Sequence, residues 1–350
     1  MFDGFYKGKR VFLTGHTGFK GAWLAMWLKR MGAVVGAFSL EPPSVPSLWE
    51  IAHVESDVIR LGGDIRDAQA VRNAMTDFRP EIVVHMAAQS LVRPSYKYPV
   101  ETFAANIMGT AHVLDAIRLT DSVRSAIMIT SDKCYENREW DKGYTEQDPM
   151  GGHDPYSASK GCAELVISSY VRSFFLDSAT AIASVRAGNV IGGGDFATDR
   201  LIPDMVRAFK KGDPVHIRSP KSVRPWQHVL EPVSGYLLLA KRLWEDKKYV
   251  GAWNFGPPDE SARTVDEVVE KFAAVWGEGA KHKLDNGEHP HEATWLKLDC
   301  TKAKIVLRWQ PHTDFEQALS LTAEWYKAWS EGDDPRELMY KQLNYFESLQ

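Results

Sequence analysis

The stretch RVFLTGHTGFKGAWLAMWLKRMG, residues 10–32, decides the fold. It begins with an apolar run at 10–15, turns through Gly15, Gly18 and Gly21, and continues as an amphipathic segment at 21–32. Glycines at this spacing let the backbone approach a pyrophosphate, and the amino end of the following helix offers free N–H groups. This strand, turn and helix predict a dinucleotide-binding unit, with cofactor contacts from the three glycines, Thr17 and Phe19.

The same alternation of strand and helix continues through the first half of the chain. We predict strands at 33–38, 81–88, 125–131 and 180–190, a helical region that ends near residue 119, and a helix at 156–176. This order implies right-handed crossovers and a parallel sheet with helices on both faces. The predicted fold class is α/β, a doubly wound parallel sheet of Rossmann type.

The second half of the chain follows a looser pattern. Glycine and proline cluster at 191–195, 210–214 and 218–227, between short helical segments. The chain has 350 residues, whereas single cores stop growing near about 250–300. We therefore predict a dinucleotide-binding domain at 1–190, to which some later segments return, and a smaller α/β substrate lobe at 191–350.

Composition and charge exclude several classes of protein. Apolar residues make up 44% of the chain and charged residues 25%, and 12 tryptophans argue against disorder. A formal net charge of −4, spread along the chain, gives no broad field for nucleic acid or an anionic membrane. No run has the length of a signal peptide or of the roughly 18 apolar residues in a membrane span. We expect a cytoplasmic protein.

The cysteines and histidines suggest no disulfide or metal. Cys134, Cys162 and Cys300 lie far apart without a CxxC pair, which favours a reducing compartment over a disulfide framework or zinc site. His289, His291 and Glu292 have a spacing that suits no standard zinc helix. We therefore expect no metal.

Two further segments predict contacts with the adenosine side of the cofactor. Asp64 and Ile65 in GGDIRD end the third predicted strand, and Ala87 and Ala88 in HMAAQS end the fourth; these four residues are the candidate contacts. An acidic residue usually ends the second strand and holds the ribose hydroxyls, but Phe38 and Ser39 stand there. The choice between NAD and NADP stays open on this point. NAD is favoured because no arginine stands there to receive a 2′-phosphate.

The segment PYSASKGCAE carries a candidate catalytic pair. Tyr156 and Lys160 are four residues apart at the start of a helix and so share one face. A free tyrosine has a pKa near 10, so it can act as a base near neutrality only beside a cation. Lys160 and a charged nicotinamide ring would supply that field. A lone pair of this kind is usually an ordinary surface pair, but the glycine-rich turn and a strand that ends in Ser131 favour catalysis.

The ordered motifs resemble the extended short-chain dehydrogenase/reductase family, in its nucleotide-sugar branch. They are TGHTGFKG, HMAAQS, ANIMGT, SDKCYE, PYSASK, RAGNVIGGGD, RPWQHV and LDCTKAKIVLRWQP, and they cover essentially the whole chain. Within that branch the likeness is closest to the CDP-glucose 4,6-dehydratases, through SDKCYEN, GHTGFKG and SVRPWQHV. The resemblance implies NAD as cofactor and CDP-glucose as substrate.

The resemblance also implies roles for the catalytic residues. Tyr156 is the active-site base, and Lys160 holds the nicotinamide ribose and lowers the pKa of the tyrosine. Ser131 bridges the substrate and Tyr156 through its hydroxyl. Asp132 and Lys133 stand where the thymidine-diphosphate-sugar dehydratases carry an Asp-Glu pair, which favours dehydration over epimerisation.

The implied chemistry explains why such a pair is needed. Hydride leaves carbon 4 of the glucose, the ketone acidifies the proton on carbon 5, water is lost across carbons 5 and 6, and hydride returns to carbon 6. Loss of hydroxide needs an acid, and Asp132 is the candidate. Lys133 can take the carbon-5 proton only if it is uncharged; a charged Lys133 would instead stabilise the enolate.

The resemblance also places residues on the substrate side. Arginine suits a diphosphate because it forms bidentate, charge-assisted hydrogen bonds. The candidates for sugar or phosphate contacts are Gln89, Ser90, Arg93, Asn189, Arg218, Arg224 and His228. Asn106 either supports the active-site water and backbone or is an ordinary capped or solvent-facing amide. We expect His85 to be a packed residue at a strand end, and Trp23 and Trp27 to be core residues.

Two other functions fit parts of the sequence. An epimerase or decarboxylase of the same branch, acting on another nucleotide sugar, would share the cofactor motifs. A non-catalytic dinucleotide sensor would be expected to have lost the Tyr156–Lys160 pair, which is intact. The family implies a homodimer or homotetramer, with 99–119 and 156–176 as the candidate interface, and no nucleic acid or membrane partner.

Overall fold

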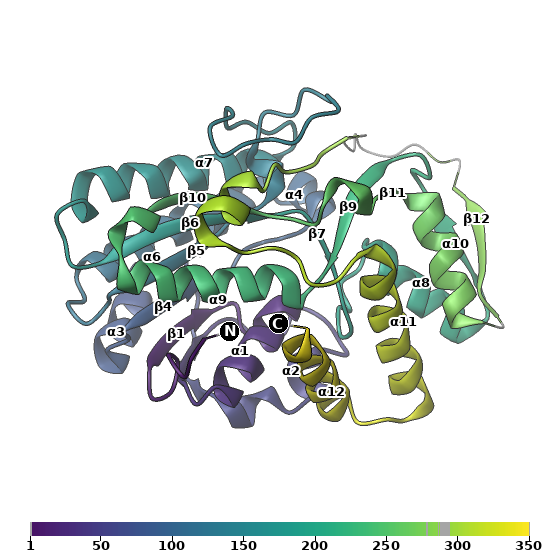
Figure 1. Cartoon of the computed structure of the whole chain (residues 1–350), viewed down its shortest axis with the longest axis horizontal. Coiled ribbons are helices and arrows are strands. Elements are labelled where there is room, and N and C mark those ends of the chain that lie inside the picture. Colours follow the sequence, from purple (N-terminus) through teal and green to yellow (C-terminus); the bar gives the residue numbers. More distant parts are fainter. Residues whose placement is uncertain (1, 278, 286, 288–294, 350) are drawn as a thin grey trace.

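A seven-stranded parallel sheet forms the centre of the molecule (Figure 1). The computed structural model describes residues 2–277, 279–285, 287 and 295–349. In spatial order the strands are β10 (Gly251–Phe255), β6 (Ala181–Ala187), β5 (Ser125–Ile129), β4 (Ile82–His85), β1 (Arg10–Thr14), β2 (Val34–Phe38) and β3 (Ile59–Arg60). All neighbours are parallel, with Leu13 paired to Ala37 on one side and to Val84 on the other. The predicted doubly wound parallel sheet is confirmed.

Helices cover both faces of this sheet, because its strands are apolar on both sides. One face packs against α1 (Phe19–Arg30) and α9 (Leu230–Glu245), in a hydrophobic core that also includes residues of α11 (Phe315–Glu331) and α12 (Pro335–Ser348). The other face packs against α3 (Ala68–Phe78), α6 (Gly109–Arg118) and α7 (Pro155–Tyr170). Trp23 and Trp27 of α1 are fully buried, as predicted for core residues.

Short helical segments connect these elements. They are α2 (Leu48–Ile51), η1 (Val54–Asp57), α4 (Val92–Lys97), α5 (Pro99–Phe103), η2 (Ala104–Met108), η3 (Asp132–Cys134), η4 (Val171–Phe175), η5 (Lys247–Tyr249), η6 (Asp259–Ser261) and η7 (Ala303–Leu307). Segments η2, η4 and η7 are π-helical turns. None of the helices in the described part of the chain combines the length and apolar character that a membrane span requires.

Smaller sheets and helices lie beyond the carboxyl ends of the central strands. One sheet has the order β11 (Ala262–Thr264), β9 (Val223–His228) and β7 (Asn189–Ile191), and β8 (Pro214–Ile217) pairs with β12 (Lys281–Leu284). Helices α8 (Leu201–Lys211) and α10 (Val265–Trp276) accompany them. Figure 1 shows α8, α10 and β12 at the opposite end of the molecule from α3.

Several predicted element boundaries were wrong. The predicted strand at 180–190 is two strands, because the chain leaves the central sheet after Ala187 and enters the smaller sheet at Asn189. The predicted helix at 156–176, by contrast, is confirmed: α7 runs to Tyr170 and the π-helical turn η4 continues it to Phe175. Strand β3 ends at Arg60, so Asp64 and Ile65 lie in the loop after it.

Candidate active site

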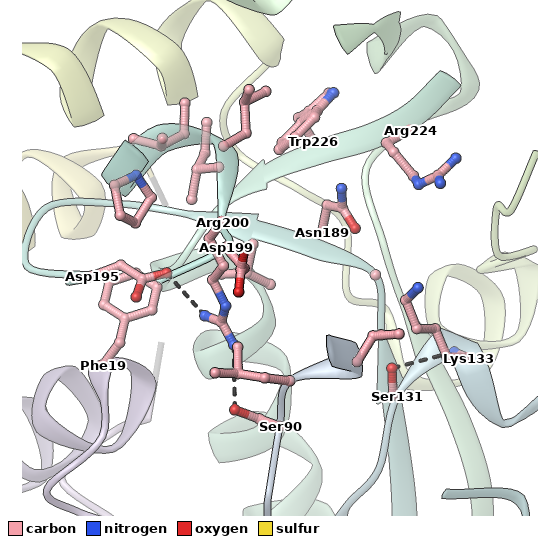
Figure 2. A pocket seen from close by; sticks show the side chains of 18 of the residues that line it. Phe19, Ser90, Ser131, Lys133, Asn189, Asp195, Asp199, Arg200, Arg224 and Trp226 are labelled. Atoms are coloured by element: carbon pink, nitrogen blue, oxygen red, sulfur yellow. Dashed lines mark hydrogen bonds and ion pairs between the residues drawn. The ribbon is translucent and has the colours of Figure 1, made fainter. Parts of the chain in front are cut away.

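The turn after β5 carries the first candidate catalytic residues. Ser131 caps the one-turn helix η3: its Oγ accepts a hydrogen bond from the backbone N–H of Lys133 at 3.2 Å. The same hydroxyl donates to Oδ1 of Asp132 at 2.9 Å. Figure 2 shows Ser131 and Lys133 on one wall of the cavity. The strand end and its polar turn therefore place three reactive side chains together.

Asp132 is a buried carboxyl group with an exposed fraction of 3%. Burial raises its pKa, against the opposing effects of the Lys133 charge, the Ser131 hydrogen bond and the Arg224 charge. Gly188, at the break between β6 and β7, leaves room for this carboxyl, since a Cβ there would lie 3.1 Å from Oδ2. The site therefore favours the protonated acid more than water does.

Helix α7 presents the second part of the site. Asp154 caps the helix by accepting a hydrogen bond from the backbone N–H of Ser157 at 3.0 Å. The backbone N–H of Tyr156 donates to Oγ of Ser95 at 3.1 Å, which anchors the first turn. Tyr156 and Lys160 are both buried one turn apart. They line the same cavity as Ser131.

Among the protein's own groups, burial has the largest effect on the pKa of Tyr156. Burial raises this pKa to about 12, and the hydrogen bond with Ser131 acts in the opposite direction without overcoming it. Burial also lowers the pKa of Lys160 to about 8, helped by the nearby charge of Lys20. The residues alone therefore hold the phenol protonated near neutrality.

The glycine-rich turn forms a cradle for a pyrophosphate. Gly15 has a φ of 78°, and a Cβ there would lie 2.6 Å from the backbone nitrogen of Ala87. A Cβ on Gly21 would lie 2.1 Å from the carbonyl oxygen of Gly15, so the turn and helix pack without a gap. Gly18 begins α1 without a side-chain cap, which leaves the first N–H groups of the helix for an anion. These features fit a dinucleotide.

The remaining candidate cofactor contacts surround this cradle. Thr17 bonds through Oγ1 to the Ser39 hydroxyl at 3.0 Å and donates to the Leu40 carbonyl at 3.1 Å, which ties the turn to the end of β2. Asp64 is held by the side chain of Arg66, which lowers the pKa of that carboxyl. Phe19 and Ala88 line the cavity that adjoins the cradle, whereas Ile65 is buried in the core cluster with Phe12 and Phe38.

A cavity of about 360 Å³ joins the catalytic turn, α7 and the smaller lobe. Its wall brings together most of the predicted site residues: Ser90, Arg93, Ser131, Asp132, Lys133, Tyr156, Lys160, Asn189, Arg218 and Arg224. Arg93 and Arg218 share the Asp199 carboxylate, with nitrogen–oxygen distances of 3.3 and 3.0 Å. Figure 2 shows Asn189 and Arg224 on the same side of the view as Lys133, with Phe19 and Asp195 on the other side.

Two predicted substrate contacts are placed elsewhere. His228 is fully buried beside the Trp23 ring, where burial lowers its pKa to about 4, so it is a core residue. Gln89 turns back into its own loop, with its amide bonded to the Leu91 backbone and the Thr102 hydroxyl. Both predictions were wrong because the side chains are used for local packing and hydrogen bonds.

Asn106 and His85 are both buried and hydrogen-bonded to neighbouring residues. Asn106 is buried, and its amide bonds the backbone N–H and carbonyl of Gln89 and the hydroxyl of Ser159. It therefore supports the backbone after β4. His85 is a packed strand-end residue as predicted: its Nδ1 lies 2.8 Å from the Thr14 hydroxyl, and burial lowers its pKa to about 3.

Two cations of the cavity wall, Lys20 and Arg200, were not predicted from the sequence. Arg200 bonds Asp195 at 2.9 Å and Ser90 at 3.4 Å, so it bridges the loop after β4 and the loop before α8 (Figure 2). Lys20 comes from the glycine-rich turn, and burial lowers its pKa to about 8. The sequence signal for Lys20 was a lysine inside an otherwise small and apolar motif. The only sequence signal for Arg200 was its spacing from Asp195.

The described residues contain no group of three or more His, Cys, Asp or Glu side chains arranged to hold a metal ion. His289, His291 and Glu292 lie outside the described residues.

Comparisons with known proteins agree with this geometry. The family model described as GDP-mannose 4,6 dehydratase matches residues 12–322. The chain is 53% identical over 336 residues, 94% of each chain, to a CDP-glucose 4,6-dehydratase of Salmonella typhimurium. Among solved structures, a dTDP-glucose 4,6-dehydratase of Streptomyces venezuelae with NAD bound superposes with a TM-score of 0.78 at 20% identity, covering 97% of this chain and all of that one. A Thermus thermophilus UDP-glucose 4-epimerase in complex with NAD gives 0.78 at 24% identity, covering 91% and 99%.

Proposed function

This chain belongs to the GDP-mannose 4,6 dehydratase family, within the extended short-chain dehydrogenases/reductases, and we therefore propose that it converts CDP-glucose into CDP-4-keto-6-deoxyglucose. The reaction is the loss of one water, so the enzyme is a lyase. The nucleotide follows from the 53% identity, over 94% of the chain, to a relative named for CDP-glucose. The cofactor is NAD, which fits the uncapped start of α1 and the cradle at Gly15 and Gly21.

The observation that carries the reaction type is the buried acid at Asp132. Elimination needs a group that can give a proton to a leaving hydroxyl, and burial raises the pKa of this carboxyl. It lies next to Ser131, which hydrogen-bonds both Asp132 and Tyr156. An acid and a tyrosine linked through one serine suit a dehydratase.

The first half-reaction uses Tyr156, Ser131 and Lys160. Bound NAD supplies the oxidising and reducing chemistry, and its positive ring lowers the pKa of a nearby phenol. Tyr156 takes the proton of the 4-hydroxyl, with Ser131 bonded to the same oxygen. Lys160 faces this end of the cavity from one turn further along α7 and holds the nicotinamide ribose. The product of this step is a 4-ketone with an acidic proton on carbon 5.

The second half-reaction uses the other two residues of the turn. Lys133 is the candidate base for the carbon-5 proton, and Asp132 gives its proton to the leaving hydroxyl of carbon 6, so that one water is released. Adjacent residues of a single helical turn suit this task because carbons 5 and 6 are bonded neighbours. Both side chains line the same cavity.

The smaller lobe binds the nucleotide diphosphate. Arg224 is buried on the cavity wall near Asp132, and Arg218 lies further along it, paired with Asp199. Guanidinium groups bind phosphate oxygens in a bidentate manner.

The proposal also includes the division of the chain at residue 190 into a cofactor domain and a substrate lobe. The three free thiols support a reducing compartment such as the cytoplasm.

Incubation with nucleotide sugars tests the proposed function. The purified protein is given NAD and, separately, CDP-, TDP-, UDP- and GDP-glucose, and the products are weighed by mass spectrometry. We expect CDP-glucose to lose one water and the other three sugars to remain largely unchanged. A product of unchanged formula would support an epimerase, released carbon dioxide a decarboxylase, and turnover of TDP-glucose in preference to CDP-glucose would overturn the nucleotide assignment.

We also propose that the chain forms a homodimer through α6, α7 and the turns beside them. Helices α5 and α6 contact α7. This group exposes several large apolar side chains: Val100, Met108, Leu119, Leu165, Phe174 and Leu176. Apolar groups gathered on neighbouring helices mark association surfaces.

Charge placed on this surface should separate the subunits. Leu165 is 61% exposed on α7, so Leu165→Asp is expected to convert the dimer to a monomer in light scattering after size exclusion, while circular dichroism stays unchanged. Ile305, 69% exposed in η7, offers a matched control. Ile305→Asp should leave the dimer intact. A parent protein that is already monomeric, or a Leu165→Asp protein of unchanged mass, would refute the interface.

A further inference from the structure

A buried ion pair lies directly behind the catalytic turn. Glu164 of α7 and Arg186 of β6 have side chains that are 5% and 4% exposed. The Arg186 Nε donates to Oε1 of Glu164 at 2.9 Å, and Nη2 donates to Oε2 at 2.8 Å. The charge of Arg186 and hydrogen bonds to the carboxylate outweigh the effect of burial and hold the pKa of Glu164 below its ordinary value. Both groups are therefore charged inside the protein.

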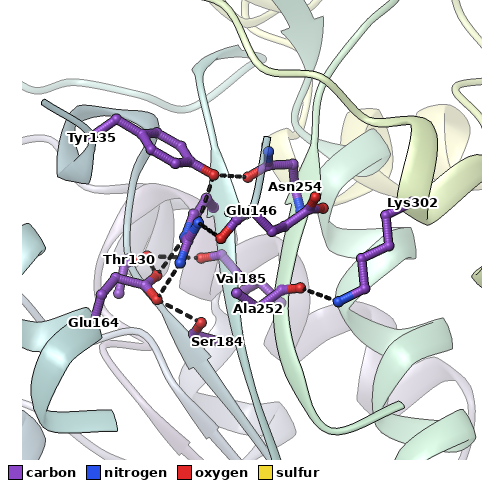
Figure 3. A network of polar contacts seen from close by, with 10 residues as sticks. Thr130, Tyr135, Glu146, Glu164, Ser184, Val185, Ala252, Asn254 and Lys302 are labelled. Carbon is purple, nitrogen blue, oxygen red and sulfur yellow. Dashed lines mark hydrogen bonds and ion pairs between the residues drawn. The ribbon is translucent and has the colours of Figure 1, made fainter. Parts of the chain in front are cut away.

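This pair is bonded to both ends of the catalytic turn (Figure 3). Before the turn, the Thr130 hydroxyl donates to Oε1 of Glu164 at 2.5 Å, and the backbone N–H of Thr130 donates to the Val185 carbonyl at 2.9 Å. After the turn, the Tyr135 hydroxyl accepts from Nη1 of Arg186 at 2.6 Å. Ser131, Asp132 and Lys133 therefore lie between two residues that share one ion pair.

The far side of Tyr135 is fixed as well. Its hydroxyl donates to Oδ1 of Asn254 at 2.8 Å, and the Asn254 amide donates to the carbonyls of Tyr144 and Asp299 at 2.8 and 3.0 Å. The Arg186 guanidinium also lies over the Tyr135 ring, 4.8 Å from its centre. Helix α7, the end of β5, β6 and β10 are thus joined through one buried network.

Glu164 also belongs to the helix that carries Tyr156 and Lys160, one turn beyond Lys160. The carboxylate that holds Thr130 thereby fixes the distance between the catalytic turn and the catalytic helix. A buried ion pair gives little net stability compared with apolar packing, whereas it fixes geometry when all its hydrogen bonds are made. At the turn this condition is met by two bonds from Arg186 and one from Thr130 to the Glu164 carboxylate. The Ser184 hydroxyl adds a bond from β6, on the side away from the turn.

We propose that the Glu164–Arg186 pair positions the turn Ser131–Lys133 against α7, with Thr130 and Tyr135 as the positioning residues through which it acts. Tyr135 lies outside the residues that line the cavity, and Thr130 lies on its wall with its hydroxyl bonded to Glu164. The inference deepens the proposed function, since it concerns the same site. An acid or hydroxyl displaced by about 1 Å can cost roughly 100-fold in rate.

Removal of either charge would leave the other buried without its partner and could unfold the protein. The test therefore uses milder variants that keep the pair. Thr130→Val removes one bond at the start of the turn, and Tyr135→Phe removes the bonds at its end. Ser184→Ala is the matched control, because the Ser184 hydroxyl donates to the same carboxylate at 2.7 Å from β6, away from the turn.

Steady-state rates are measured with whichever nucleotide-glucose the parent enzyme turns over, so failure of the CDP-glucose assignment would not affect the comparison. We expect kcat to fall roughly 10- to 100-fold in Thr130→Val and Tyr135→Phe, with KM unchanged. Ser184→Ala should keep the parental kcat. Thr130→Ser, which retains the hydroxyl, should restore most of the rate lost in Thr130→Val.

A second readout separates positioning from general weakening of the fold. In heavy water, recovered substrate that carries deuterium on carbon 5 reports ketone formation without elimination. The backbone N–H of Tyr135 donates to the Asp132 carbonyl, so Tyr135→Phe should disturb the position of the acid. We therefore expect this variant to raise the ratio of deuterated substrate to product. Equal losses of kcat in Ser184→Ala and Thr130→Val, or a rise in KM with kcat unchanged, would overturn the positioning role.

Discussion

Asp132→Asn is expected to lose product formation by roughly 100- to 10,000-fold, the usual contribution of a general acid, while the first half-reaction continues. The buried carboxyl has a raised pKa and therefore holds its proton to higher pH than an exposed aspartate. Asparagine fills nearly the same space beside Gly188 but has no proton of suitable acidity to give. Oxidation at carbon 4 and removal of the carbon-5 proton do not need that proton.

The measurement is made in heavy water with mass spectrometry of both sugar pools. Asp132→Asn should return CDP-glucose that carries one deuterium, with almost no 4-keto-6-deoxy product. Asp121→Asn is the control, because Asp121 is an exposed residue before β5, and this variant should behave as the parent. Product at the parental rate would show that another group supplies the proton, and loss of exchange together with product would place Asp132 in the earlier step.

The fold could be predicted from the central strands and the glycine-rich turn, because their sequences encode local structure. The apolar runs at 10–15 and 125–131 and the glycines at 15, 18 and 21 encode local structure, and parallel strands bring their carboxyl ends to one edge. Ser131 and Tyr156 could be placed together by that rule alone. The break at Gly188 could not, because a strand that changes sheets keeps its apolar character across the break.

The wrong prediction for His228 and the failure to predict Arg200 both result from tertiary contacts. His228 is buried because Trp23, more than two hundred positions away, packs beside it. Arg200 reaches the cavity through bonds to Asp195 and to Ser90 of a distant loop. Neither contact leaves a periodic pattern in the sequence. Burial raises the pKa of Tyr156, and the YxxxK motif does not encode this effect.

Tyr156→Phe is expected to abolish both half-reactions, in contrast to Asp132→Asn. In the proposed mechanism the phenolate oxygen of Tyr156 takes the 4-hydroxyl proton, and phenylalanine keeps the ring while removing that oxygen. Without the 4-ketone the carbon-5 proton is not acidic, so neither deuterium exchange nor product should be seen. The expected loss is again roughly 100- to 10,000-fold, and it should apply equally to exchange and to product.

The comparison of the two variants tests the division of labour at this site. Tyr170→Phe, at the other end of α7, is the control for loss of a tyrosine hydroxyl and should keep parental rates. Because burial lowers the pKa of Lys160 to about 8, the parent should lose the first half-reaction as pH rises through that value and Lys160 loses its charge. Deuterium exchange that persists in Tyr156→Phe would assign the 4-hydroxyl proton to another base. If exchange disappears in Tyr156→Phe but survives in Asp132→Asn, oxidation depends on Tyr156 and elimination depends on Asp132.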